Sequence, residues 1–167
     1  MDKLKFMILA HSYLRQLILA TAVTTSLIAS GGTIMVKNKT FLAEVALTPQ
    51  EQARGLMYRQ SLSANRCMIF LYDNDQPRPI WMKNCLISLD VVWVNREGRI
   101  VGLLSNLPPC PPSRGDDCPT YGGSFIARHF VEFSAGTIAR LNLKIGDRLS
   151  WDIELDDGRR VQTPTQR

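Results

Sequence analysis

The stretch PIWMKNCLISLDVVWV, residues 79–94, decides the fold class of this chain, because most of it is typical of a β-sheet. Two runs of apolar and β-branched residues, at 80–81 and 91–94, predict strands. Polar side chains inside such a stretch either support the loop between two strands or line a site, and the sequence leaves both readings open. Four polar or reactive side chains interrupt the pattern: Lys83, Asn84, Cys85 and Asp90.

The same patterns along the chain predict a mainly β fold. Two short helices are expected, one at 49–56 with a capping box formed by Thr48 and Glu51, and one at 135–141. Because these helices are too few and too short for parallel crossovers, we expect a single antiparallel β-sandwich or barrel-like domain. Strands are predicted at 40–47, 67–72, 79–84, 90–95, 99–105, 125–134 and 148–155, with a possible return strand at 159–163.

The first 31 of the 167 residues differ in composition from the rest. They combine a basic start, an uncharged run at 17–29 and small residues at 29–31. This pattern predicts a signal peptide, or an N-terminal membrane anchor if it is not cleaved. We therefore expect an exported protein, periplasmic or secreted, with one β-rich domain at 32–163 and a loose tail at 164–167.

The charges of the expected domain exclude one class of partner. Without residues 1–31 the chain keeps 17 basic and 14 acidic side chains, a net charge of +3, and these are scattered. Nucleic-acid binding needs a clustered basic surface, so no nucleic-acid partner is expected. The expected partner is a small molecule or a component of the cell envelope, and membrane contact is expected only through an uncleaved N-terminal segment.

Four cysteines follow the expected leader, and an even number in an exported chain favours disulfides. If 67–72 and 79–84 form a hairpin with Asp73 opposite Pro79, Cys67 faces Cys85 at bridging distance. Cys110 and Cys118 flank a short loop, and a second disulfide is predicted there. Neither pair has the spacing of a redox or zinc motif.

No known catalytic motif is present, and no cofactor or metal is expected. His129 is the one histidine after the leader, which makes a histidine-based catalytic set or metal site improbable. Either carboxylate, Asp90 or Glu132, could act as acid or base, with Lys83 or Arg59 stabilising charge. Strand alternation also places Trp81 and Lys83 on one face, where they can hold a ligand or simply cover each other.

Several motifs together resemble the family called domain of unknown function 192, over about residues 40–153. The resemblance implies a small, mostly β, sandwich-like and often exported protein, and it implies no activity. Two positions depart from the family pattern, and both are cysteines: Cys67 replaces the usual glycine and Cys85 the usual threonine, which favours the Cys67–Cys85 pairing. The matching motifs are GLMYR (55–59), MIF (68–70), WMKN (81–84), LISLD (86–90), PPC to CPTY (108–121) and EFSAGTIARLNLKIGD (132–147).

Three functions are compatible with the sequence. The first is a module that binds a small polar or carbohydrate ligand. The second is a hydrolase of envelope material that uses Asp90 and Glu132. The third is a structural or interaction module in which these motifs only specify the fold. The candidate ligand-binding residues are Arg59, Trp81, Lys83, Asn84, Asp90 and Tyr121.

Overall fold

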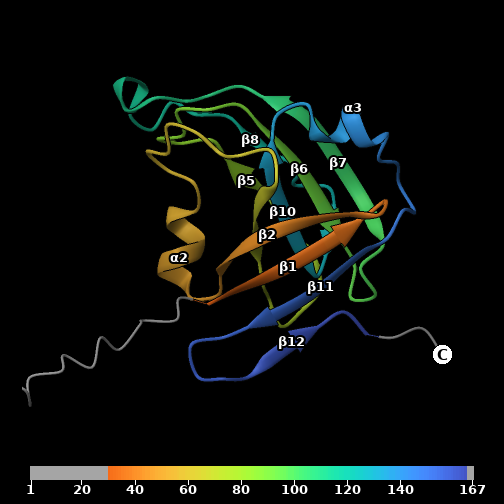
Figure 1. Cartoon of the computed structure of the whole chain (residues 1–167). Coiled ribbons are helices and arrows are strands. Elements are labelled where there is room, and N and C mark those ends of the chain that lie inside the picture. Colours follow the sequence, from red (N-terminus) through yellow and green to blue (C-terminus); the bar gives the residue numbers. More distant parts are fainter. Residues whose placement is uncertain (1–29, 165–167) are drawn as a thin grey trace, which may run out of the picture.

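The computed structural model describes residues 30–164, and its main feature is one strongly curled sheet of eight strands (Figure 1). The strands follow the order β12-β11-β1-β2-β3-β10-β6-β7 across the sheet. Two short α-helices, α2 (Pro49–Arg54) and α3 (Thr137–Leu141), lie in connections between described strands, and the predicted mainly β class is confirmed. The strands are β1 Gly31–Val36, β2 Lys39–Ala46, β3 Arg66–Phe70, β6 Leu89–Val94, β7 Ile100–Leu107, β10 His129–Ser134, β11 Leu149–Glu154 and β12 Arg160–Gln162.

The sheet curls until β7 meets the start of β11, which gives it a barrel-like shape. Ile100, the first residue of β7, donates its backbone N–H to the Asp147 carbonyl oxygen at 2.8 Å. Leu149, the first residue of β11, donates to the Gly98 carbonyl oxygen at 2.8 Å. These bonds satisfy backbone groups that an open edge would present to another chain.

One neighbouring pair, β2 and β3, is parallel, whereas the sequence predicted an antiparallel sheet. Leu42 of β2 lies opposite Arg66 of β3. A parallel pair needs a crossover of a dozen or more residues, and the connection 47–65, which contains α2, supplies one. The prediction was wrong because it considered only the length of the helix and not the length of the whole connection 47–65.

β1 is the strand of the eight-stranded sheet that the sequence did not predict, and it lies inside the sheet. It pairs with β2 on one side and with β11 on the other. Gly32 allows this close packing, because a Cβ at that position would lie 2.1 Å from the Asp152 carbonyl oxygen. The first described strand therefore begins at Gly31, the last residue of the predicted leader.

The remaining expectations for the chain ends fall on residues that the structure does not describe. The leader or anchor at 1–29 and residues 165–167 of the tail lie outside the described range. Between residues 30 and 164, no helix has the length and hydrophobicity needed to cross a membrane.

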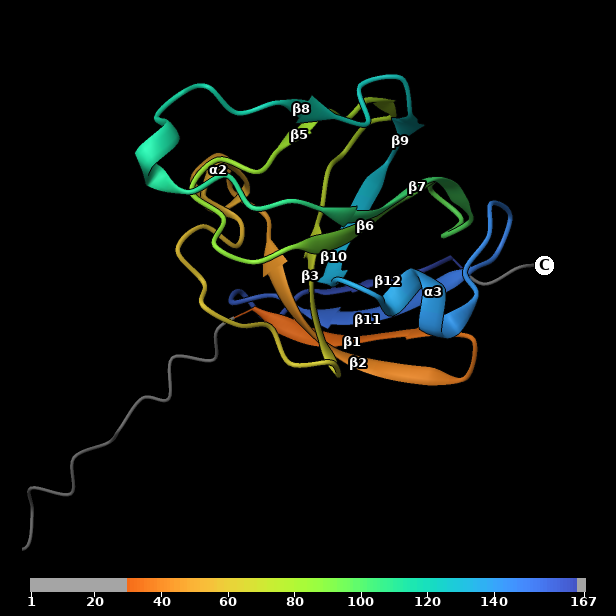
Figure 2. The same ribbon diagram turned by 90° about the horizontal axis from the view of Figure 1, so that it is seen from above.

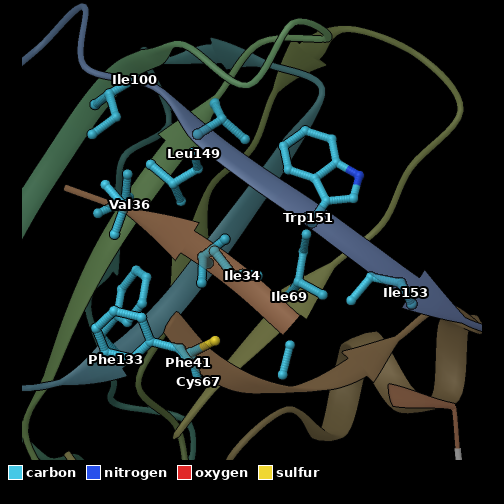
Figure 3. Close-up of a cluster of buried hydrophobic side chains, with 14 of the residues drawn as sticks. Ile34, Val36, Phe41, Cys67, Ile69, Ile100, Phe133, Leu149, Trp151 and Ile153 are labelled. Atoms are coloured by element: carbon cyan, nitrogen blue, oxygen red, sulfur yellow. The ribbon is translucent and has the colours of Figure 1, made fainter. Parts of the chain in front are cut away.

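Two hydrophobic cores lie on opposite faces of the central strands. The first core gathers inward-facing side chains of β1, β3, β10 and β11, among them Ile34, Ile69 and Phe133 (Figure 3). The second core lies on the other face and contains Trp93 and Phe130. Burial stabilises each large apolar side chain by about 1.5–3 kcal/mol, so strands β6 and β10, buried on both faces, anchor the fold.

The second core is covered by short strands and loops rather than by a long sheet. The pair β5 (Ile80–Trp81) and β8 (Thr120–Tyr121) lies on one side of β6 and β10, and β1, β2 and β11 lie on the other (Figure 2). A second short pair joins β4 (Gln76–Pro77) to β9 (Ile126–Ala127). The predicted strand 79–84 is thus shortened to two residues.

The predicted Cys67–Cys85 disulfide is wrong, and both thiols are free. It assumed that the chain turns back after 67–72, but β3 is flanked by β2 and β10. Cys67 therefore lies opposite Ala43 and Phe133, and its side chain belongs to the first core. Cys85 belongs to the second core, on the other face of the sheet.

The second predicted disulfide is present. Cys110 and Cys118 are joined by an S–S bond of 2.08 Å, with their Cα atoms 6.0 Å apart. The bridge closes residues 110–118, here called the disulfide loop, which contains the 3-10 helix η1 (Pro112–Arg114).

Removing this bridge is expected to destabilise the fold moderately. The C110S/C118S variant should lose about 2–3 kcal/mol of unfolding free energy, because the closed loop no longer restricts the unfolded chain. Urea denaturation measures the loss. Reduction of the wild type should reproduce it, whereas the variant should be insensitive to reductant. Equal unfolding midpoints for variant and oxidised wild type would contradict the expectation.

Candidate functional site

A pocket of about 100 Å³ lies where α2, the turn after it and β5 approach β10. Its floor and walls come from segments that are far apart in the sequence, so no single motif marks it. We call it the Glu132 pocket. The side chains that give it chemical character are Tyr72, Trp81, Lys83, Cys85, Phe130 and Glu132.

Helix α2 forms one wall, and its capping box is the one predicted. The Thr48 hydroxyl accepts a hydrogen bond from the Glu51 backbone N–H at 3.3 Å, and the Glu51 carboxylate accepts one from the Thr48 N–H at 2.8 Å. Gly55 ends the helix with a φ of 44°, a conformation that favours glycine. A Cβ on Gly55 would lie 3.1 Å from the Phe70 ring, so this residue also lets the turn pack against the pocket floor.

The motifs GLMYR and WMKN meet beside the pocket through two left-handed residues. Tyr58 has a φ of 62° and Asn84 a φ of 58°. The Tyr58 backbone N–H donates to the Asn84 carbonyl oxygen at 2.8 Å, and the Asn84 amide lies 3.6 Å from the Met57 sulfur. Asparagine is one of the few residues that adopts this backbone conformation readily, which explains its place in the turn. Asn84 thus supports the pocket wall.

Glu132 is the least expected feature of the pocket. Its side chain is 6% exposed on β10, and its Oε2 atom has no hydrogen-bond partner among the described residues. Burial raises the pKa of this carboxyl from 4.5 to about 8, so it is mainly protonated at neutral pH. Burial, with a smaller effect of the Glu132 charge, raises the pKa of the nearby Cys85 thiol to about 12.

Trp81 and Lys83 lie on the same face, as strand alternation predicted. The Lys83 Nζ atom is 5.0 Å from the centroid of the Trp81 ring, within the range of a cation–π contact. Lys83 also forms an ion pair with Asp116 of the disulfide loop. The Trp81 side chain remains 45% exposed, so an aromatic surface is available at the pocket.

The structure does not bring the other candidate residues into the Glu132 pocket. Arg59 forms an ion pair with Glu44 and lines a separate hollow of about 420 Å³ on the other side of the 55–57 turn. Tyr121 pairs with Ile80 and packs against the second core. These two side chains therefore support neighbouring surfaces.

Asp90 has a structural role and does not line the Glu132 pocket. It is completely buried, and its two carboxylate oxygens accept hydrogen bonds from the backbone N–H groups of Asn106, at 2.8 Å, and Ile138, at 2.7 Å. The carboxylate thus ties β6 to β7 and to the first turn of α3. Its position explains why an acid opens an apolar strand.

The acid–base pair of the hydrolase hypothesis is not formed. Across β10 and β6, Glu132 lies opposite Val91, a residue of the second core, and Asp90 lies opposite Phe133, a residue of the first core. Side chains of successive strand positions point to opposite faces, so the two carboxyl groups are separated by the sheet. They cannot act together on one substrate.

The sequence indicated Glu132 as an acid–base candidate but did not predict that its side chain is buried. β10 is a central strand, buried on both faces along most of its length. A signal was available: a lone carboxylate within the apolar run HFVEF is typical of a strand covered on both sides. Nothing in the sequence pointed to Tyr72 or Phe130 as its neighbours.

Within residues 30–164, no group of three or more His, Cys, Asp or Glu side chains is placed to hold a metal ion. The side chains that line the Glu132 pocket include a carboxyl group, a free thiol, an ammonium group and aromatic rings.

Comparison with known proteins identifies the family of this chain but indicates no activity. A model of the family DUF192, described as an uncharacterized ACR, matches residues 32–151. The chain belongs to the DUF192 family. The segments GLMYR, WMKN and EFSAG that surround the Glu132 pocket and Asp90 all fall within this match. A search of curated proteins finds no match.

Two crystal structures of other proteins share the fold. A protein of unknown function from Novosphingobium aromaticivorans DSM 12444 is 28% identical, with a TM-score of 0.61 over 73% of this DUF192 chain and 84% of its own. A protein from Sinorhizobium meliloti 1021, described as a candidate transcription regulator, is 27% identical, with a TM-score of 0.60 over 73% and 92% of the two chains.

Proposed function

We propose that this DUF192 domain binds a small polyhydroxylated ligand, such as one sugar unit, in the Glu132 pocket. The observation that carries the proposal is Glu132 itself, which lines the pocket and whose buried Oε2 atom has no hydrogen-bond partner among the described residues. A buried polar atom left unpaired costs about 1–3 kcal/mol, so a ligand that supplies the missing hydrogen bond gains that amount.

The protonation state of Glu132 suits a hydroxyl group. A neutral carboxyl group has both an O–H donor and an acceptor oxygen, which matches a hydroxyl that also donates and accepts. The exposed face of Trp81 offers an apolar platform for the C–H face of a sugar ring. Lys83, held by Asp116, adds a donor at the same wall.

The size of the pocket limits the ligand. One water molecule needs about 10–15 Å³ of such a volume, so about 100 Å³ accepts several heavy atoms at once. The pocket therefore fits a terminal group or a single ring edge, and the rest of a longer ligand would extend over Trp81.

The proposed location is an oxidising compartment outside the cytoplasm. The Cys110–Cys118 disulfide supports this, because such bonds persist in exported proteins and are rare in the reducing cytosol. The leader-like composition of residues 1–31 points the same way. An envelope sugar is accordingly the first class of ligand to test.

Tryptophan fluorescence can detect the ligand directly. Trp93 and Trp151 are buried in the two cores, so Trp81 is the solvent-exposed reporter at the pocket. Titration with glucose, N-acetylglucosamine and glucuronate is expected to give a saturable change for at least one sugar, with a Kd of about 1–10 mM.

Two variants separate specific binding from general effects. Trp81→Ala is expected to weaken sugar binding at least about tenfold, or 1.4 kcal/mol. Because this variant lacks the fluorescent reporter Trp81, its binding is measured by saturation-transfer NMR. Tyr58→Ala removes an aromatic side chain that is more exposed than Trp81 and lines the neighbouring hollow, and it should bind as the wild type does. Absence of saturation with all three sugars, or equal weakening by both variants, would leave the structural module as the better description.

A further inference from the structure

The free Cys85 thiol lies next to the disulfide of the chain. Cys85 and Cys110 form an isolated antiparallel bridge between their backbones, so the two residues are directly opposed. Both are buried, and both belong to the second core. Cys110 is at the same time the partner of Cys118. Cys110 is thus bonded to one cysteine and paired through its backbone with another.

The backbone distances allow Cys110 to bond to either neighbour. Directly opposed residues of an antiparallel pair have Cα atoms about 4.5–5.5 Å apart, and disulfides occur at about 4.4–6.8 Å. The existing bridge has a Cα–Cα distance of 6.0 Å. Cys67 is excluded from this set, because its side chain lies in the first core on the opposite face of the sheet.

We propose that Cys85 exchanges with Cys118 as the disulfide partner of Cys110, so that the domain has two disulfide states. The Cys85 thiol loses its proton to solvent, and the thiolate attacks the Cys110 sulfur. A Cys85–Cys110 bond forms, the Cys110–Cys118 bond breaks, and Cys118 leaves as a thiolate that takes up a proton. The step starts with one disulfide and one thiol and ends with one disulfide and one thiol, so it needs no oxidant or reductant.

The surroundings of the three sulfurs set the direction and rate of this step. Cys118 is partly exposed, so water can solvate it as the leaving thiolate, whereas Cys110 is buried. Cys85 lines the Glu132 pocket, from which solvent can reach it. Its burial disfavours the attacking thiolate, so the exchange is slow in the resting protein and the Cys110–Cys118 state persists.

The exchange has a structural consequence at the pocket. Asp116, which holds Lys83 beside Trp81, lies in the disulfide loop. When Cys118 leaves, this loop is no longer closed, and a thiol becomes available on the surface for a partner or an oxidant. This inference concerns the cysteines alone and holds whether or not the pocket binds a sugar.

Peptide mapping of the unreduced chain tests the exchange directly. Trypsin cleaves after Lys83, Arg96 and Arg114, which places Cys85, Cys110 and Cys118 on three separate peptides. The native full chain is incubated with N-ethylmaleimide, which traps each released Cys118 thiol, and the digested products are identified by mass spectrometry. The expected products are the peptide with labelled Cys118 and the pair of peptides joined by a Cys85–Cys110 bond, in equal amounts.

Matched variants decide whether Cys85 is the attacking group. In Cys85→Ser, label on Cys118 is expected to fall at least about tenfold, whereas Cys67→Ser, which removes the other buried thiol, stays within about twofold of the wild type. Unchanged Cys118 labelling in Cys85→Ser, or a wild type whose only bond remains Cys110–Cys118 after prolonged incubation, would overturn the proposal.

A second variant tests the same pairing without depending on the exchange rate. In Cys118→Ser, with folding checked by circular dichroism, oxidised glutathione is expected to produce a Cys85–Cys110 disulfide through a short-lived glutathione adduct of Cys110. A stable glutathione adduct on Cys110 with Cys85 still reduced would show that the two sulfurs cannot meet, and the inference would fail.

Discussion

Asp90→Ala is expected to lower the free energy of unfolding by about 3–5 kcal/mol, because a buried and a partly buried backbone N–H group lose their acceptor at once. One belongs to Asn106 on β7, and the other to Ile138 in the first turn of α3. Each unpaired buried donor costs about 1–3 kcal/mol, and the removed side chain also leaves a void. Urea denaturation followed by circular dichroism measures the loss.

Two further variants show whether the hydrogen bonds are the cause. Asp90→Asn keeps one acceptor oxygen and should recover part of the lost stability. Asp152→Ala removes a carboxylate that is 41% exposed and pairs with Arg160, so it should cost less than about 1 kcal/mol. If Asp90→Ala were as mild as Asp152→Ala, the proposed link between β6, β7 and α3 would be refuted.

Glu132→Gln is expected to change how stability depends on pH. The pKa of Glu132 is raised by burial from 4.5 in the unfolded chain to about 8 in the folded one. The folded state therefore favours the neutral carboxyl. The contribution of Glu132 to the free energy of unfolding is complete below pH 4.5 and is lost as the pH rises to 8. The difference between the two pKa values corresponds to at most about 4–5 kcal/mol. A glutamine has no proton to lose and should not show this decline.

The measurement compares unfolding free energies of wild type and variant from pH 5 to pH 8.5. His129 acts in the opposite direction, because burial lowers its pKa from 6.5 to about 4. The stability that neutral His129 contributes is lost as the pH falls from 6.5 towards 4. The difference between the two proteins cancels the His129 effect and should grow steadily in favour of Glu132→Gln above pH 5. Glu154→Gln, at an exposed position, should follow the wild type. Parallel curves for wild type and Glu132→Gln would rule out a protonated Glu132.

Together these two residues show why the candidate site was only partly predictable. Asp90 and Glu132 lie on neighbouring central strands, and both are single carboxylates in apolar runs. Their roles differ because one meets two backbone donors and the other meets an open pocket. Ile138 is 48 positions from Asp90, and Gln52 of the pocket is 80 positions (132 − 52) from Glu132, so no local pattern specifies these neighbours.

The cysteines also show which features could be predicted from the sequence and which could not. The Cys110–Cys118 bridge was predictable because it closes a short loop, where proximity in sequence ensures proximity in space. The Cys67–Cys85 bridge failed because it depended on which strands are neighbours. A register error within a hairpin would have shifted the two cysteines by only a residue or so. In the structure β3 lies between β2 and β10, so the predicted hairpin does not exist.

The sequence by itself determined the features that depend on neighbouring residues: the mainly β class, the capped helix α2, the short helix α3, the disulfide loop and the shared face of Trp81 and Lys83. Alternation, capping and short loop closure act over a few residues, so their patterns can be read directly. Only the tertiary structure decided that β1 lies inside the sheet, that β2 and β3 are parallel, that Glu132 is buried at a pocket and that Cys85 lies beside Cys110. These depend on strand order, which is selected by the packing of two cores over the whole chain.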